Sequence, residues 1–151
     1  MSLLIYELDY CPNKSYSGTL TALEDDYIEI IEQAGIKGCV YWYTQGYYEG
    51  SGFALFYFQK LWFLNDLGHC SCYGPIERGS VIQALKSTAY KSLEELLNAC
   101  SAGLQLDIKP LVQLAKNKLP QYCYKEEEKE VKGKTRKLMI SWASSSDGVE
   151  Q

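Results

Sequence analysis

The stretch His69-Cys70-Ser71-Cys72, which follows Asp66 and precedes Gly74-Pro75, carries the residue types that could do chemistry. It places the only histidine of the chain beside two of its six cysteines. A catalytic thiol needs a base that lowers its pKa and a third polar group that orients the base. Adjacent side chains of an extended segment point to opposite sides, so His69 is expected to serve Cys72 rather than Cys70. Asp66, His69 and Cys72 are therefore the candidate catalytic residues of a thiol hydrolase or transferase.

Two other interpretations of this stretch stay open. Histidine and cysteine are preferred zinc ligands, but Cys70 and Cys72 are separated by one residue, and no second CxxC or HxxxH pair completes a site. We therefore expect neither a metal nor a cofactor. In the third interpretation the stretch is a structural turn, in which Gly68 and Gly74 adopt unusual dihedrals and Asp66 and His69 satisfy backbone groups.

Length and composition predict a single domain over residues 1–143 followed by a flexible tail, 144–151. The chain has 151 residues, of which 46% are hydrophobic, enough to bury a core. Its formal charge of −4 argues against a general nucleic-acid binder, which needs a basic surface. The late lysines and arginine at 132–137 follow a run of glutamates at 126–130, which indicates a solvated mixed-charge face.

The beginning of the chain predicts a cytoplasmic location and no membrane association. It lacks the basic start of a secretory signal, and its first apolar run ends at Glu7, too early for a membrane span. In the reducing cytosol the six cysteines are expected to be free thiols.

The first two thirds of the chain alternate between strand and helix signals. A strand is expected over 3–8, and a helix capped by Thr21 with Glu24 is expected to end at Gly35. Aromatic and branched residues then predict strands over 39–43, 52–58 and 61–64, joined by turns at 49–52 and 59–60. Such short links can form only an antiparallel meander.

Further helices are expected to start at Ser80, at Ser92, where Gly103 would end the helix, and at Asp107, with Pro110 in its first turn. Residues 122–124 and 138–142 are expected to form a charged C-terminal edge hairpin with a turn at 132–133. The predicted fold class is α+β: an antiparallel sheet, made of the meander and this hairpin, packed with three to four helices.

Tyrosine is unusually frequent, with thirteen copies, so several must reach the surface. Exposed aromatic rings offer rigid contact area at low entropic cost and are favoured at protein interfaces. Tyr47, Tyr48 and Tyr73, together with Glu77, are the candidate binding residues.

Two segments resemble a signature of small bacteriophage and bacterial proteins. They are Tyr48-Glu49-Gly50-Ser51-Gly52-Phe53-Ala54 and the segment from Asp66-Leu67-Gly68-His69-Cys70-Ser71-Cys72 through Tyr73-Gly74-Pro75-Ile76-Glu77. The resemblance implies a phage or prophage origin, but the group brings no established activity and no catalytic role.

The expected function is that of a small phage-type regulatory or inhibitory protein, which binds a host protein, such as a component of a defence system, through an aromatic surface. The alternative is a thiol-dependent enzyme or zinc module centred on Asp66, His69 and Cys72. The sequence predicts neither the partner's identity, nor the oligomeric state, nor any small ligand.

Overall fold

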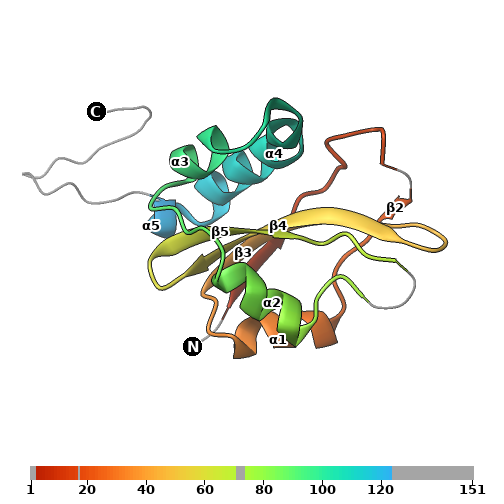
Figure 1. The fold of residues 1–151 in the computed structure, drawn as a ribbon, viewed down its shortest axis with the longest axis horizontal. Helices are drawn as coiled ribbons and strands as arrows, with labels where there is room; N and C mark the ends of the chain where they lie inside the picture. Colours follow the sequence, from red (N-terminus) through yellow and green to blue (C-terminus); the bar gives the residue numbers. More distant parts are fainter. Residues whose placement is uncertain (1–2, 17, 71–73, 124–151) are drawn as a thin grey trace, which may run out of the picture. The chain divides into compact units, whose positions relative to one another are not determined.

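The computed structural model describes residues 3–16, 18–70 and 74–123 of the chain. They fall into two compact units, Met1–Leu119 and Pro120–Gln151. In the first unit one sheet lies between two pairs of helices, with α1 and α2 on one face and α3 and α4 on the other (Figure 1). The α+β class predicted from the sequence is confirmed.

The sheet has the strand order β1-β3-β4-β5, and β2 pairs with the far end of β3. Its strands are β1 (Leu4–Glu7), β2 (Thr19–Leu20), β3 (Gly38–Gln45), β4 (Gly50–Phe58) and β5 (Leu61–Asp66). The predicted meander β3-β4-β5 is antiparallel. The sheet as a whole is mixed, however, because β1 runs parallel to β3 with Leu4 opposite Gly38. The connection between these two strands contains a helix and is long enough for a crossover, which the prediction of a purely antiparallel sheet overlooked.

The two hairpin turns differ in how well they were predicted. Gln59 and Lys60 form the predicted two-residue link, with φ values of 53° and 68° that match the right-handed twist of the flanking strands. The β3–β4 turn lies at 46–49, earlier than predicted, and Gly50–Gly52 belongs to β4. Gly52 is required there by close approach, since a Cβ atom would overlap the carbonyl oxygen of Trp42.

Helix α1 (Asp25–Gln33) begins after Glu24 and not after Thr21. Thr21 is extended beside β3, where its N–H donates to the Tyr43 carbonyl at 2.8 Å and its hydroxyl donates to the Thr19 carbonyl at 2.7 Å. This pairing takes the hydroxyl that the predicted capping box needs. Gly35 follows the helix with a φ of +91°, as predicted.

Helix α2 (Arg78–Leu85) begins two residues before Ser80, the predicted start. The Ser80 hydroxyl accepts from the N–H of Glu77 at 3.1 Å and so helps to fix the first turn. Helix α3 (Leu93–Asn98) begins as predicted, because the Ser92 hydroxyl accepts from the Glu95 N–H at 3.1 Å.

Helix α4 (Ala102–Lys118) corrects two predictions. Gly103 does not end the preceding helix but lies in the first turn of α4, which is capped by the Ser101 hydroxyl. Asp107 is no cap either: it lies inside α4 and is 5% exposed. Pro110 accordingly lies in the helix interior.

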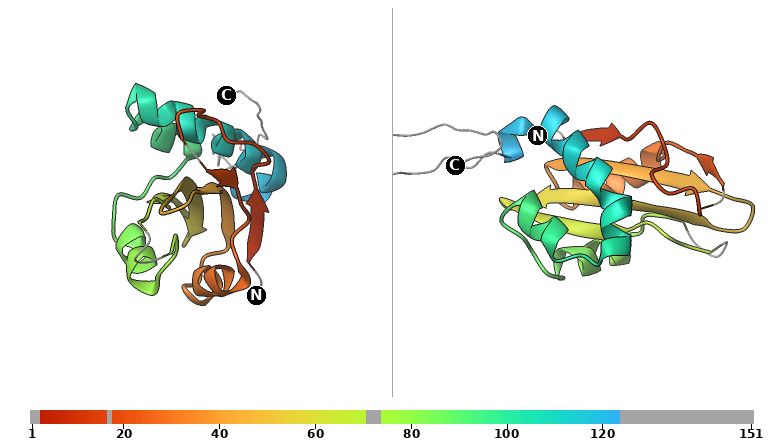
Figure 2. Two further views of the ribbon diagram at one scale, coloured as in Figure 1. Left: turned by 90° about the vertical axis from the view of Figure 1, so that its right-hand side faces the viewer. Right: turned by 90° about the horizontal axis from the view of Figure 1, so that it is seen from above.

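Strand β3 is buried on both faces, which explains its nearly continuous apolar run. Cys39, Tyr41 and Tyr43 pack toward α1 and α2, in one core cluster with Phe56 and Ile31. The alternate residues of β3 face α4 on the other side of the sheet, where Nε1 of Trp42 donates to the Asp107 carbonyl. Figure 2 shows the sheet between the two helix pairs.

The second unit contributes one described element, α5 (Pro120–Cys123). Residues 122 and 123 are therefore helical, which contradicts the predicted strand there; Pro120 suits a first helical position because its φ is already fixed. The described residues thus form five helices, more than the three to four expected. The rest of the predicted hairpin and the tail 144–151 lie outside the described residues. Among the described helices, none is both long and apolar enough to cross a membrane.

Candidate functional site

A pocket of about 400 Å³ lies beside the β3–β4 hairpin, on the face of the sheet that carries α1. Its walls come from residues 21–24 and Tyr27 before and within α1, from the hairpin turn, from His69, and from Gly74-Pro75. The tyrosine pocket, as we call it, is defined by its polar and aromatic lining: Tyr27, Tyr43, Tyr47, Tyr48, Glu24, Glu49 and His69.

His69 is anchored by backbone and side chain alike. It pairs with Gly50 through two backbone hydrogen bonds of 3.0 and 3.1 Å. Its Nδ1 lies 2.6 Å from the carbonyl oxygen of Cys70, and its Nε2 lies 2.5 Å from the hydroxyl of Tyr43. A carbonyl can only accept, so Nδ1 carries a hydrogen; when the ring is neutral, Nε2 accepts from the Tyr43 hydroxyl. Both ring nitrogens are thus engaged by groups that hold the imidazole in place.

Two glycines make room for these aromatic side chains. A Cβ atom at Gly50 would lie 2.5 Å from Nε2 of His69 and 2.6 Å from the hydroxyl of Tyr43. A Cβ atom at Gly74 would overlap the hydroxyl of Tyr27. An alanine at either position would therefore force these side chains to move from their places in the pocket.

Burial, with smaller electrostatic contributions from Tyr27 and Glu24, raises the pKa of Tyr43 to about 12. The phenol consequently stays protonated at neutral pH and keeps donating to His69. Glu24 and Tyr43 both line the pocket.

Of the three candidate catalytic residues, the structure describes Asp66 and His69. Oδ1 of Asp66 accepts from the N–H of Gly68 at 2.7 Å, and the Asp66 charge helps to raise the pKa of Tyr16, whose ring lies against Trp42 on the α4 side of the sheet. The His69 ring nitrogens contact Tyr43 and the Cys70 carbonyl, and the Asp66 carboxylate is bound to the N–H of Gly68 instead. Cys72 lies outside the described residues.

The structure places cysteines outside the His69 segment as well, among them Cys39, Cys11 and Cys100. Cys39 is fully buried, and burial raises the pKa of its thiol well above the usual range, so it is a core side chain. The thiols of Cys11 and Cys100 donate to the backbone carbonyls of Asn13 and Leu96. Within the part of the chain that the structure describes, no three His, Cys, Asp or Glu side chains gather closely enough to hold a metal ion.

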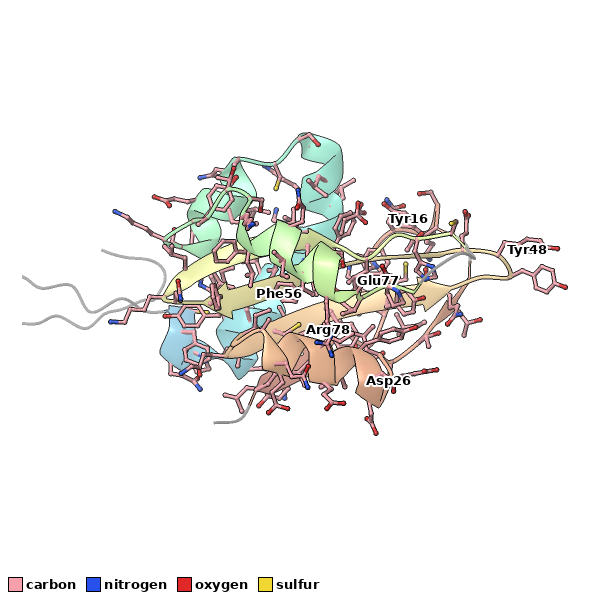
Figure 3. The ribbon with its side chains drawn as sticks, turned by 60° about the horizontal axis from the view of Figure 1, so that its bottom comes forward. Tyr16, Asp26, Tyr48, Phe56, Glu77 and Arg78 are labelled. Carbon is pink, nitrogen blue, oxygen red and sulfur yellow. The ribbon has the colours of Figure 1, made fainter. Side chains whose placement is uncertain are left out.

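Of the candidate binding residues, Tyr47 and Tyr48 lie together at the tip of the β3–β4 hairpin. Their side chains are 89% and 69% exposed, and their rings meet edge to face with centroids 4.5 Å apart. Figure 3 shows Tyr48 at the far end of the hairpin and Glu77 at the start of α2, back from the tip. Glu77 is exposed and does not line the pocket. Tyr73 lies outside the described residues.

The sequence prediction missed Tyr27, Tyr43, Glu24 and Glu49 as lining residues. A signal existed for Tyr43, because strand alternation puts it on the same face as Cys39 and Tyr41. Glu24 was assigned to a capping box, but its side chain makes no cap hydrogen bond in the structure. Its proximity to the hairpin turn depends on the packing of α1 against the sheet.

A second polar cluster lies on the opposite face and is structural. The buried carboxylate of Asp107 accepts from the Asn13 amide at 2.9 Å and from the Tyr16 hydroxyl at 3.0 Å. The backbone carbonyl of the same residue accepts from Nε1 of Trp42 at 2.8 Å. These bonds tie the loop after β1 and the sheet to α4, and every polar group in the cluster has a partner.

The pocket and the exposed tip of the hairpin therefore form one continuous surface, since Tyr47 and Tyr48 belong to both. This surface is the candidate functional site on geometric grounds. Comparison of the chain with protein-family models, with curated proteins and with solved structures finds no match to any of them.

Proposed function

We propose that this protein is a non-enzymatic binding module that docks the tip of its β3–β4 hairpin, with the adjoining tyrosine pocket, onto a partner protein. The observation that carries the proposal is the pair Tyr47 and Tyr48, two exposed rings packed edge to face at the rim of a pocket. Mutual packing restricts the two side chains before binding, so less rotamer entropy is lost when a partner covers them.

The hairpin presents these rings on a rigid base. Strands β3 and β4 pair without interruption from Gly38 to Gln45, and the turn is closed by a hydrogen bond of 2.7 Å from Gly46 N–H to the Glu49 carbonyl. Aromatic residues that are exposed in the free protein and become fully covered are the residues that dominate interface affinity. The predicted phage setting would make the partner a host protein.

The experiment is site-specific photo-crosslinking in living cells. A photoreactive phenylalanine replaces Tyr48 in one variant and Tyr10, a 53% exposed tyrosine that does not line the pocket, in a control variant. The expected result is a discrete crosslinked protein from position 48 and none from position 10. After purification of that protein, the double variant Tyr47→Ala, Tyr48→Ala should lower its affinity by about 2 kcal/mol or more, roughly thirtyfold. Crosslinking that is equal at both positions, or absent from position 48, contradicts the proposal.

One observation favours the alternative, a thiol-dependent enzyme: His69 borders a pocket, as a catalytic imidazole must. If the imidazole activated Cys72, that thiol would react with iodoacetamide faster than an unperturbed thiol at neutral pH, and His69→Ala would abolish the difference. We expect no such acceleration, because Nε2 of His69 is engaged by Tyr43.

A further inference from the structure

The tyrosine pocket combines aromatic rings with uncompensated negative charge. Glu24 and Glu49 contribute carboxylates, and none of its described lining residues is lysine or arginine. Among the described residues, the one ion pair is between Lys116 and Glu94. Neither pocket carboxylate is therefore neutralised by a lysine or arginine of the described chain. Glu24 stands at the N-cap of α1 without using its side chain to cap the helix, so its carboxylate is available to a ligand.

Whether the pocket prefers a cation or an anion depends on two opposing charges, the partial positive charge of the α1 N-terminus and the negative charge of the carboxylates. The N-terminus of α1 lies at the pocket and contributes the equivalent of roughly half a positive charge, which alone would favour an anion. Glu24 at this helix end and Glu49 from the hairpin both line the pocket, and each brings a full negative charge. The negative charge exceeds the contribution of the helix severalfold, and the pocket is a site for a cation.

Resting on the proposed function, we infer that the occupant of the tyrosine pocket is an arginine side chain of the partner protein. A guanidinium group stacks on tyrosine faces and donates to carboxylates from the same plane, and it is less strongly hydrated than an ammonium group. Tyr47 and Tyr48 rise beyond the pocket and give the chain that bears the arginine a surface to cover. A small free cation would leave that surface exposed.

The test uses a blocked pentapeptide with a single arginine between glycines, titrated into the full-length, isotope-labelled protein. The matched peptide carries citrulline, which keeps the shape of arginine and removes its charge. Amide signals of Ala22, Gly46 and Gly74, which line the pocket, should shift with the arginine peptide. The dissociation constant of so small a ligand should be on the order of 1 mM. The citrulline peptide should leave the signals in place.

Charge variants separate a local site from general attraction to an acidic protein. E24Q/E49Q should weaken the arginine peptide about fivefold. E29Q/E32Q, with the same net charge and with both changes on the exposed side of α1 away from the pocket lining, should not. Glu24 makes no cap hydrogen bond, so the first variant should keep its melting temperature, which is measured alongside.

Three results would overturn the inference. The citrulline peptide could bind as tightly as the arginine peptide, or E24Q/E49Q and E29Q/E32Q could weaken the arginine peptide equally. Spermidine could also cause the same shifts at a lower concentration than the arginine peptide, which would identify a free polycation as the ligand. These failures leave the proposed function standing if crosslinking from position 48 persists in E24Q/E49Q. If crosslinking from position 48 is absent in the unsubstituted background, the proposed function itself fails.

Discussion

The hydrogen bond between Tyr43 and His69 can be isolated by a double-mutant cycle. Tyr43→Phe removes the donor and keeps the ring, while His69→Ala removes the acceptor. The two side chains meet at 2.5 Å, with stacked rings whose centroids are 5.8 Å apart. If the bond is made as the geometry indicates, the two substitutions must be strongly non-additive in the free energy of unfolding.

The expected magnitudes follow from the burial of the two partners. Tyr43→Phe should cost about 1 kcal/mol, the net value of a neutral hydrogen bond, because the Nε2 that it leaves behind borders the pocket and can reach water. His69→Ala should cost about 2 kcal/mol, since it strands the hydroxyl of Tyr43, a residue only 2% exposed, and also removes the stacked ring. The coupling free energy should be about 1 kcal/mol.

Tyr41 offers a matched control on the same strand and the same face. Its hydroxyl accepts from the N–H of Leu23 at 3.0 Å, a buried bond that does not involve the histidine. Tyr41→Phe should destabilise the protein by about 1–2 kcal/mol, because it strands a buried backbone donor. Its cycle with His69→Ala should be additive to within about 0.5 kcal/mol.

Urea unfolding, followed by the fluorescence of the three tryptophans, gives the free energies for both cycles. A coupling between positions 43 and 69 that is no larger than the coupling between 41 and 69 would refute the assigned hydrogen bond. Far-ultraviolet circular dichroism should confirm that each variant keeps the native secondary structure.

Three further expectations concern the fold. Gly52→Ala should destabilise the protein by about 3 kcal/mol, because the new Cβ atom would overlap a carbonyl of β3. Gly103→Ala should be neutral or stabilising, because there is open space around that position. Urea unfolding measures both changes, and equal effects would refute the close approach at Gly52. The thiol of Cys39 should be alkylated only on unfolding, as peptide mass spectrometry can show, since it is fully buried; early labelling would contradict this. Burial raises the pKa values of Tyr41 and Tyr43 from 10.0 to about 12, so the unfolded chain loses these protons first. Stability should therefore be complete below about pH 10 and decline toward pH 12, and urea unfolding at a series of pH values would disprove this if stability rose.

Much of the fold was predictable because its signals are local. The meander follows from runs of aromatic and branched residues separated by links too short for a crossover, and these runs became β3, β4 and β5. Gly35 ends α1 and Ser92 begins α3 because the positive φ and the hydroxyl acceptor are properties of single residues. The exposure of Tyr47 and Tyr48 follows from their position in a hairpin turn.

Where several local signals competed, tertiary contacts decided between them. Asp107 has the chemistry of a helix cap, yet Asn13 and Tyr16, more than ninety positions away, bind its carboxylate inside α4. Thr21 and Glu24 have the spacing of a capping box, yet Thr21 is held extended beside β3, so the helix begins later. The competing partners are distant in sequence, and no local pattern records them.

The candidate site shows the same division. The sequence by itself indicated that His69 follows β5 and that tyrosines reach the surface at the hairpin, but His69 forms an antiparallel bridge with Gly50 and not the predicted turn. Only the tertiary structure decided that the His69 ring nitrogens contact Tyr43 and the Cys70 carbonyl, and that the Asp66 carboxylate is bound to the N–H of Gly68 instead. It also placed Glu24, at the N-cap of α1, around the same pocket as Tyr43 from β3, because the apolar face of α1 must pack against the sheet. The charge of the pocket is thus a consequence of how hydrophobic surfaces are buried.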